Sequence, residues 1–385
     1  MKEIRVGIIG TGIIANSHVQ EYQKIPGVTV VAACDLIEKK LNSFCDKYGI
    51  EHRYIDFREL LKRDDLDTVS VCLHNNLHMP VSVRVMEAGF HCYCEKPMAG
   101  TYADAAKMLK CAEDTGKKLH IQLAGLYKPH AFCAKKFIED GRLGKIYHAR
   151  SYGYRRRGRP FVDGYGEKEF NSSQWAAGGA LYDMGVYHIS VLLYLLGKPK
   201  VKTVTGQVYQ ELDMDAGRRA ESGFDVEELG CGFVRFDGGL TMDILESWAI
   251  NAGAFPPSLI AGSKGGLSYK TFSEDSNEAL IYYSELSGYP VESKIDVGAE
   301  RYRLRKIDPS ITIFNGSQPV WVAAMRGECP WPDTAEIGLS TMLISEGIYM
   351  SSKLGREFTS DEITANSKSS SFTRQDTPFG VIEYN

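Results

Sequence analysis

The stretch IRVGIIGTGIIANSHV, residues 4–19, decides the fold class of this chain. Residues 4–9 are apolar and rich in β-branched side chains, which is typical of a buried strand, and an amphipathic helical segment follows. Gly10 permits a tight turn, Gly12 lets a backbone approach a pyrophosphate closely, and Ala15 allows close packing of helix on strand. The helix N-terminus then offers N–H groups to phosphates, so the pattern predicts a dinucleotide-binding turn rather than an ordinary one.

Strand-like and helical segments alternate through the rest of the first 124 residues. The strand candidates are 4–9, 28–34, 68–73, 91–94 and 119–123, and the helical candidates between them are 36–48, 57–63, 79–88 and 101–115. Strands that alternate with helices are joined by right-handed crossovers in a parallel sheet. The first part of the chain is therefore predicted to be an α/β, doubly wound Rossmann domain.

Asp35 is the second cofactor signal. It follows the strand 28–34 and lies 25 residues after Gly10, where a carboxylate can accept both hydroxyls of a ribose. The same carboxylate repels a 2′-phosphate, and Leu36 rather than an arginine comes next. The sequence therefore favours NAD over NADP. The alternative to dinucleotide binding as a whole is an ordinary turn followed by a surface aspartate.

The pattern of strand and helix candidates changes near residue 124, where longer and more polar strand candidates begin. These are 145–155, 201–210, 229–236, 240–249 and 279–284, with helices expected at 129–140, 183–196 and 335–353. Their spacing predicts a largely antiparallel sheet. We expect an NAD-binding domain at 1–124, a substrate-binding and oligomerisation domain at 125–365, and a tail at 366–385 that is mobile or docks Phe379, Val381 and Ile382 on a partner.

Composition narrows the class of protein. The chain has 385 residues, 43% of them apolar and 24% charged, with a formal net charge of −4, so no strong field recruits nucleic acid or a lipid surface. Nine cysteines without a CxxC pair indicate reduced structural thiols, among them a buried Cys92 and Cys94. No apolar run approaches the roughly 20 residues that span a bilayer, and the N-terminus lacks a convincing cleavage site. We expect a cytoplasmic protein.

The turn Glu95-Lys96-Pro97 is a candidate for chemistry, because it ends the strand 91–94 at the edge where α/β sheets bind ligands. A lysine there can be catalytic when burial or nearby charge lowers its pKa, although an exposed charged turn is an equal alternative. His74 and His78 have helical metal spacing. Their position beside the expected cofactor argues against a metal, and His78 is expected to contact the cofactor or substrate side.

These motifs together resemble the Gfo/Idh/MocA oxidoreductase family, which includes glucose–fructose oxidoreductase, inositol dehydrogenases and dihydrodiol dehydrogenase. The residues that carry the resemblance are Gly10-x-Gly12-x-x-Ala15, Asn75-x-x-His78, Glu95-Lys96-Pro97 and Gly178-Gly179-Ala180-Leu181-x-Asp183-x-Gly185-x-Tyr187. Weaker pieces are Gly141–Lys145, Gly262–Gly266 and the segment from Asp333 through Tyr349. The ordered set extends over nearly the whole chain.

The resemblance implies a Rossmann domain followed by an α/β domain with an open, mostly antiparallel sheet, whose face builds the interface of a homodimer or homotetramer. It places Lys96 beside the nicotinamide as the catalytic lysine, Asp183 as the active-site acid, and Tyr187 where relatives have His or Tyr. Asp183 and Tyr187 are expected on one helix face. The cofactor contacts expected are Gly10, Thr11, Gly12, Ile13, Ile14, Asp35, His74, Asn75, His78, Glu95 and Lys96.

Two departures leave roles open. The chain has Leu73-His74-Asn75 where relatives often have Thr-Pro-Asn, and Leu126-Tyr127 where they often have Arg-Phe. His188 directly follows Tyr187 and points about 100° away on a helix, so it is less suited to acid–base chemistry but stays a candidate. We hypothesise that Tyr187 relays the hydroxyl proton with help from Lys96, while Asp183 orients the sugar. The alternative makes Lys96 the base.

Eight aromatic side chains lie between residues 151 and 190, together with the cluster Arg155-Arg156-Arg157-Gly158-Arg159. Aromatic faces stack on sugars, although a core or interface stripe is equally plausible. The arginines could bind an anionic group or a neighbouring subunit. Substrate contacts are expected from Tyr154, Arg157, Trp175 and His188. Glu227 and Glu228 are expected at a solvated edge, and Trp321 and Trp331 under the final helix.

The expected activity is NAD-dependent oxidation of a ring secondary hydroxyl of a sugar, cyclitol or glycoside, for example C3 of a glycoside, by hydride transfer to nicotinamide C4. One alternative is redox-neutral glycoside cleavage, in which transient oxidation acidifies a neighbouring C–H and the aglycone is eliminated. A third reading is a non-catalytic NAD-binding regulator, against which the retention of Lys96, Asp183 and Tyr187 argues.

Overall fold

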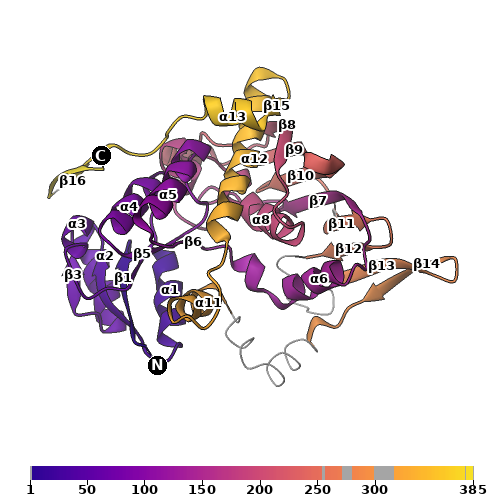
Figure 1. The fold of residues 1–385 in the computed structure, drawn as a ribbon. Coiled ribbons are helices and arrows are strands. Elements are labelled where there is room, and N and C mark those ends of the chain that lie inside the picture. The colour runs from indigo at the N-terminus through magenta and orange to yellow at the C-terminus, as the bar shows by residue number, and fades with distance from the viewer. Residues whose placement is uncertain (1, 254–255, 271–279, 299–315, 378, 385) are drawn as a thin grey trace. The chain divides into compact units, whose positions relative to one another are not determined.

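The computed structural model describes residues 2–253, 256–270, 280–298, 316–377 and 379–384 (Figure 1). The chain forms two compact units. The first comprises Met1–Gln122, Ile313–Leu339 and Lys368–Asn385, and the second comprises Leu123–Thr312 and Ser340–Ser367, as far as these segments are described. Each unit is built around its own sheet.

The first unit contains a six-stranded parallel sheet in the order β3-β2-β1-β4-β5-β6. Its strands are β1 (Ile4–Ile9), β2 (Val28–Cys34), β3 (His52–Tyr54), β4 (Thr68–Val71), β5 (His91–Cys94) and β6 (Leu119–Ile121). Its helices are α1 (Ile13–Gln23), α2 (Glu38–Tyr48), α3 (Phe57–Leu60), α4 (Asn75–Glu87), α5 (Tyr102–Thr115) and α11 (Ser317–Met325). The predicted doubly wound parallel sheet is confirmed. The short β3 was not predicted, because three residues carry no periodicity.

Helix α4 begins at Asn75, four residues earlier than the sequence pattern predicts, and Pro80 lies inside it. Proline has no N–H, so the carbonyl of Asn76 loses its helical partner. The N–H of Phe372, in the C-terminal segment, donates to that carbonyl at 3.3 Å. The tail therefore compensates for the proline, and the helix continues through it.

The C-terminal segment belongs to the first unit. The expectation that this tail is mobile or docks on a partner stays a prediction. The segment forms a hairpin of β16 (Arg374–Thr377) and β17 (Gly380–Glu383). Ile382 is buried, and the ring of Tyr384 stacks on Phe57 with centroids 6.0 Å apart. Phe379 and Val381 are exposed. The last residues thus complete the unit that the first residues begin.

The tryptophans expected under the final helix have a different place. Trp321 in α11 contacts His91, Tyr93 and His120 on β5 and β6, and Trp331 packs against Trp321 with ring centroids 5.1 Å apart. The indole N–H of Trp321 donates to the Thr68 hydroxyl at 3.2 Å. The reason is that α11 packs on a face of the parallel sheet beside α1, and its Trp321 ring lies over β4, β5 and β6.

The second unit contains a nine-stranded sheet in the order β14-β13-β12-β11-β7-β10-β9-β8-β15. Its strands are β7 (Ile146–Tyr154), β8 (Val201–Tyr209), β9 (Leu229–Phe236), β10 (Thr241–Ser247), β11 (Ser258–Gly262), β12 (Gly266–Tyr269), β13 (Leu280–Leu286), β14 (Tyr289–Lys294) and β15 (Phe358–Thr359). Its helices are α6 (Pro129–Glu139), α7 (Ser173–Ala176), α8 (Val186–Leu195), α9 (Ala216–Ser222) and α13 (Ser360–Asn366), and α12 (Thr334–Leu354) enters it from the first unit. Among the described strands of this sheet, only β7 and β10 pair in parallel, so the predicted mostly antiparallel sheet is confirmed.

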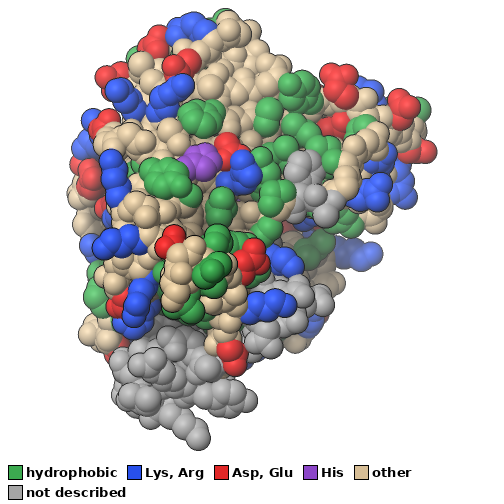
Figure 2. Space-filling view, turned by 90° about the vertical axis from the view of Figure 1, so that its right-hand side faces the viewer, with side chains coloured by type: hydrophobic (Ala, Val, Ile, Leu, Met, Phe, Trp, Pro, Cys, Tyr) green, Lys and Arg blue, Asp and Glu red, His purple; other side chains and the backbone are tan. Residues whose placement is uncertain are grey.

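The two faces of this sheet differ. Helix α12 covers one face so closely that a Cβ atom on Gly206 or Gly232 would meet Ile348 within 3 Å. On the other face, Tyr152 and Leu245 are adjacent and only half-buried. On the side of the molecule drawn in Figure 2, hydrophobic side chains gather in patches beside single acidic and basic ones. The alternation along β7 therefore separates a covered face from a partly exposed one.

Candidate functional site

The glycine turn of the first unit has the geometry of a phosphate cradle. Gly10 has φ +90°, and a Cβ atom there would lie 2.2 Å from the carbonyl oxygen of Cys72, so only glycine fits. At Gly12, by contrast, a Cβ atom would meet no protein atom within 4 Å. Gly12 is the N-cap of α1 and gives it no side-chain cap, and Ile13 behind it is 71% exposed. Open space thus adjoins helix N–H groups where a pyrophosphate would bind.

Asp35 lies at the end of β2 and is fixed against this turn. Its Oδ2 accepts from the N–H and the hydroxyl of Thr11, each at 2.8 Å, and its Oδ1 accepts from the N–H of Ile37 at 2.8 Å. The side chain is half-buried, and each carboxylate oxygen can accept more than one bond. The turn and the carboxylate are therefore held together in the arrangement that a dinucleotide with a free ribose requires. These residues fit NAD.

A buried histidine supports the Glu95-Lys96-Pro97 turn. His18 on α1 donates from Nε2 to Glu95 Oε1 at 2.7 Å, and its Nδ1 is 3.4 Å from Cys72 Sγ. Burial alone would lower the pKa of His18, but the charges and hydrogen bonds of Cys72 and Glu95 raise it to about 10. Burial would raise the pKa of Glu95, yet His18 and Lys96 hold it below its ordinary value. A charged pair is therefore buried beneath the turn.

Lys96 itself is half-buried, and its backbone N–H donates to Glu95 Oε2 at 3.1 Å. The Lys96–Pro97 peptide bond is cis. On the other side of the turn, the ring of His78 lies 2.7 Å from the Pro97 carbonyl oxygen and 3.0 Å from that of Leu73. Burial lowers the pKa of His78, so the neutral ring donates through one nitrogen. His78 is fully buried and supports the turn from behind.

In the second unit, Asp183 lies in a π-helical turn, Leu181–Gly185, that leads into α8. Such turns are frequent at functional sites. Within residues 178–190, Asp183 and Tyr187 are the two side chains that are only half-buried. That the two side chains share one helix face stays a prediction. The indole N–H of Trp248 donates to Asp183 Oδ2 at 2.9 Å.

Glu227 holds the start of that turn. Its carboxylate accepts from the N–H groups of Gly179 at 2.8 Å and Leu181 at 2.9 Å, and a Cβ atom on Gly179 would lie 1.9 Å from the Glu227 carbonyl oxygen. Burial raises the pKa of Glu227. Glu227 and Glu228 are both buried, so the expectation of a solvated edge is wrong. Their carboxylates are satisfied by partners distant in sequence, which a local pattern does not reveal.

His188 turns away from Tyr187 into the second unit. Its Nδ1 lies 2.9 Å from Glu246 Oε2, and Ser151 donates to Glu246 Oε1 at 3.2 Å. A Cβ atom on Gly153 would lie 2.1 Å from the His188 ring, so the pair occupies the space that this glycine leaves. Burial raises the pKa of Glu246 despite the charge and hydrogen bonds of His188 and Ser151.

The remaining candidates surround the end of β7 and the loop after it. Tyr154 and Trp175 are half-buried, whereas Arg157 is exposed and donates to Asn251 Oδ1 at 2.9 Å. Arg159, four residues after Arg155, is buried, so the arginine cluster does not form a single basic surface. His74 lies half-buried directly before α4 and Asn75 is buried at its start.

Three supporting side chains escaped the sequence analysis: His18, Trp248 and Glu246. His18 lies eight residues after Gly10, and this spacing within the first helix could have suggested a residue facing the sheet. Trp248 and Glu246 carry no local signal.

Among the described residues, no cluster of His, Cys, Asp or Glu could hold a metal ion, and the nine cysteines are free thiols. None of the described helices is both long enough and apolar enough to cross a bilayer.

A parallel Rossmann sheet with a glycine turn and a carboxylate after β2 defines the class, an NAD-binding oxidoreductase. The chain belongs to the Gfo/Idh/MocA family. Residues 4–123 match the model described as "Oxidoreductase family, NAD-binding Rossmann fold", and residues 133–268 match the "GFO/IDH/MocA C-terminal domain".

Its relatives include dehydrogenases of sugars and cyclitols. It is 30% identical to D-glucoside 3-dehydrogenase of Escherichia coli over 64% of this chain and 71% of the relative. It is 28% identical to inositol 2-dehydrogenase of Salmonella typhimurium over 51% of this chain and 55% of the relative. A solved levoglucosan dehydrogenase in complex with NADH has a similar fold, with a TM-score of 0.75, 19% identity and coverage of 93% and 99%. The chain is therefore an NAD-dependent dehydrogenase acting on CH–OH groups.

Proposed function

We propose that this enzyme oxidises a ring secondary hydroxyl of a sugar, cyclitol or glycoside, for example C3 of a glycoside. The relative that is a D-glucoside 3-dehydrogenase supports this substrate class. The observation that carries the proposal is the half-buried carboxylate of Asp183, which is held by Trp248 and lies four residues before the half-buried Tyr187. A fixed carboxylate beside a phenol can accept one sugar hydroxyl while the phenol meets its neighbour.

The first unit binds the cofactor in this proposal. The turn from Gly10 to Ile14 receives the pyrophosphate, and Asp35 accepts the ribose hydroxyls. His74 and Asn75 adjoin the nicotinamide end, and Glu95 and His78 hold the Lys96 turn. When bound, NAD supplies the hydride acceptor at nicotinamide C4. NAD binding is assigned to residues 1–124 and sugar binding to residues 125–365 of a cytoplasmic enzyme.

Proton transfer is assigned to Tyr187, with Lys96 lowering the pKa of the phenol or bonding the same substrate oxygen. Asp183 orients the sugar by accepting from an adjacent hydroxyl. Lys96 as the base itself is the competing assignment. His188 is the weaker candidate, because its Nδ1 is already engaged by Glu246. Tyr154, Arg157 and Trp175 are assigned to the wall of the sugar site.

The test is NADH absorbance after mixing the protein with NAD and a panel of methyl glucosides, inositols, free sugars and aryl or C-linked glycosides. NADH formation with a product two mass units lighter is expected. Aglycone release without net NADH would instead establish redox-neutral glycoside cleavage. NAD binding without turnover of any compound would contradict the proposal and favour a regulatory role.

A second proposal concerns assembly: the partly exposed sheet face pairs with another copy to give a homodimer or homotetramer. Tyr152 and Leu245 on that face would become buried. Leu245→Glu is expected to give monomers in light scattering, whereas Leu286→Glu, at a hairpin end where Leu286 is 68% exposed, serves as the matched control. An unchanged oligomer in Leu245→Glu would exclude this face.

A further inference from the structure

Trp248 directly follows β10 and is almost completely buried. Its one polar side-chain group, the indole N–H, donates to a carboxylate that is only half-buried. The acceptor is Asp183 Oδ2, which lies 2.9 Å from Nε1. An indole is a donor only, so it cannot take up a proton from Asp183 or exchange roles with it. The contact therefore fixes the orientation of the carboxylate without adding a group that could carry protons.

The indole and the Asp183 turn share one small core. Its buried members are Val162, Ala180, Met184, Phe224, Val226 and Trp248. Ala180 and Met184 lie on the helical segment that carries Asp183. Phe224 meets the indole edge to face, with ring centroids 6.5 Å apart. Packing alone thus keeps the ring beside the turn, and the N–H bond then selects one rotamer of the carboxylate.

The backbone of Trp248 is held from the opposite side. Its N–H donates to the carbonyl oxygen of Glu228 at 2.8 Å, and the Ser247 hydroxyl contacts the carbonyl oxygens of Glu228 and Ala249. The indole is therefore anchored to the chain segment immediately before β9 as well as to its own core.

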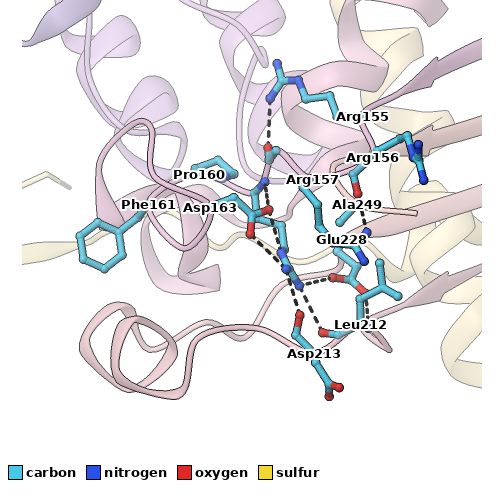
Figure 3. A network of polar contacts seen from close by, with 12 residues as sticks. Arg155, Arg156, Arg157, Pro160, Phe161, Asp163, Leu212, Asp213, Glu228 and Ala249 are labelled. Atoms are coloured by element: carbon cyan, nitrogen blue, oxygen red, sulfur yellow. Dashed lines mark hydrogen bonds and ion pairs between the residues drawn. The ribbon is translucent and has the colours of Figure 1, made fainter. Parts of the chain in front are cut away.

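Glu228 in turn belongs to the buried network drawn in Figure 3. Arg159 donates to Glu228 Oε2 at 3.0 Å, to the carboxylate of Asp163, and to the carbonyl oxygens of Leu212 and Asp213. The other carboxylate oxygen of Glu228 accepts from the N–H groups of Glu211 and Leu212. Because this buried ion pair is fully hydrogen-bonded, the segment that holds Trp248 is rigid.

We propose that Trp248 is a positioning residue that fixes the carboxylate of Asp183 for recognition of the sugar. The role in sugar recognition rests on the proposed function of Asp183. The bond itself does not, so the two can fail separately.

The first test uses the bond alone. The chain has four tryptophans, so a protein labelled with ¹⁵N-tryptophan has four indole signals. Trp248→Phe identifies one of them, and Asp183→Asn is expected to move that signal more than the other three. If Asp183→Asn leaves the Trp248 signal in place, the proposal is overturned, whatever the enzyme does with sugars.

The second test uses turnover of methyl β-D-glucopyranoside and myo-inositol as probes. In Trp248→Phe, which keeps an aromatic ring in the core, kcat/KM for the sugar is expected to fall about tenfold while KM for NAD stays within twofold. Trp321→Phe is the matched control, because Trp321 is equally buried and also donates its indole N–H, in that case to Thr68. The control is expected to keep both values.

A double-mutant cycle separates positioning from packing. In the Asp183→Asn background, Trp248→Phe is expected to cost less than twofold more in kcat/KM. An equal tenfold loss in both backgrounds would show that Trp248 acts through packing, and would overturn the proposal. A wild-type enzyme that turns over neither probe nor any panel compound would count against the proposed function, while the indole signals would still decide the bond.

Discussion

Two buried histidine–glutamate pairs adjoin the two groups proposed to act on the proton, one pair in each unit. His18 and Glu95 lie 2.7 Å apart beneath Lys96, and His188 and Glu246 lie 2.9 Å apart behind Tyr187. The pKa of Glu95 is lowered, whereas that of Glu246 is raised by burial. Similar distances and burial therefore produce opposite effects on the carboxyl group.

The difference lies in what else reaches the carboxylate. Glu95 also accepts the backbone N–H of Lys96 and experiences its charge, and Cys72 adds to the interactions that keep His18 protonated. Besides His188, the one hydrogen-bond partner of the Glu246 carboxylate within the described residues is the Ser151 hydroxyl, and a neutral donor favours the charged form less. These additional interactions explain why the pKa of Glu95 is lowered although its carboxylate is buried.

The largest effect should come from the groups that the pairs support. Lys96→Met is expected to lower kcat by about 10²–10⁴-fold, because it removes both a charge and a proton donor from the reacting oxygen. Tyr187→Phe should fall in the same range if the phenol relays the proton. Steady-state rates with the compound found in the panel test this. A Lys96→Met enzyme with full turnover would sink both versions of the mechanism.

The next largest effect is expected on the free energy of unfolding when one partner of the His18–Glu95 pair is removed. His18→Gln leaves Glu95 buried without its counter-charge, so the free energy of unfolding at pH 7 should fall by about 3 kcal/mol. His188→Gln should cost distinctly less, since burial raises the pKa of Glu246, which therefore takes up a proton more readily than Glu95, whose pKa is lowered. Urea denaturation followed by fluorescence measures both. Equal losses would mean that the two pairs do not differ in charge.

The pH dependence of stability sharpens the comparison. The folded pKa of His18 is raised from 6.5 to about 10, so its contribution is complete below pH 6.5 and is lost as pH rises toward 10. The free energy of unfolding of the wild type should therefore fall, relative to His18→Gln, by up to about 1.4 kcal/mol per pH unit across that window. Urea unfolding at pH 6.5, 8 and 9.5 measures the slope. Parallel curves for the two proteins would contradict a charged His18.

The smallest effect is expected at Glu246. Its raised pKa means that folding favours the protonated form, with that stability present below the unfolded pKa and lost as pH rises through the folded value. An amide resembles a protonated carboxyl, so Glu246→Gln should change the free energy of unfolding at pH 6 by less than about 1 kcal/mol. Glu95→Gln, measured beside it, should cost more. A reversed order would refute the assignment of charge.

Much of the first unit could be predicted from sequence, because its signals are local. The turn at Gly10 and Gly12, the carboxylate at Asp35 and the alternation of strands and helices each lie within a short window. In the second unit, the short strands β11, β12 and β14 were not predicted. Their few residues lie among turns and carry weak periodicity.

The side chains that support the candidate site, such as His18 and Arg159, could not be predicted, because their partners are far away along the chain. Arg159 and Glu228 are separated by 69 residues, and His18 and Glu95 by 77. A glutamate beside another glutamate resembles a solvated edge until the fold brings a guanidinium or backbone donors to it. The acidic and aromatic residues at the candidate site were found through family motifs, but what holds them in place was visible only in three dimensions.

The docking of the C-terminal hairpin has a consequence for biosynthesis. The strands of the parallel sheet leave the ribosome before the second unit is made, whereas α11 and the segment that contacts Asn76 and Phe57 follow most of the second unit. At about 5–20 residues per second, the nascent Rossmann sheet waits tens of seconds for these parts. A fragment that stops after β6 would leave the rings of Tyr93 and His120 uncovered by Trp321. Cofactor binding should therefore mature only after α11 and the C-terminal hairpin have been made.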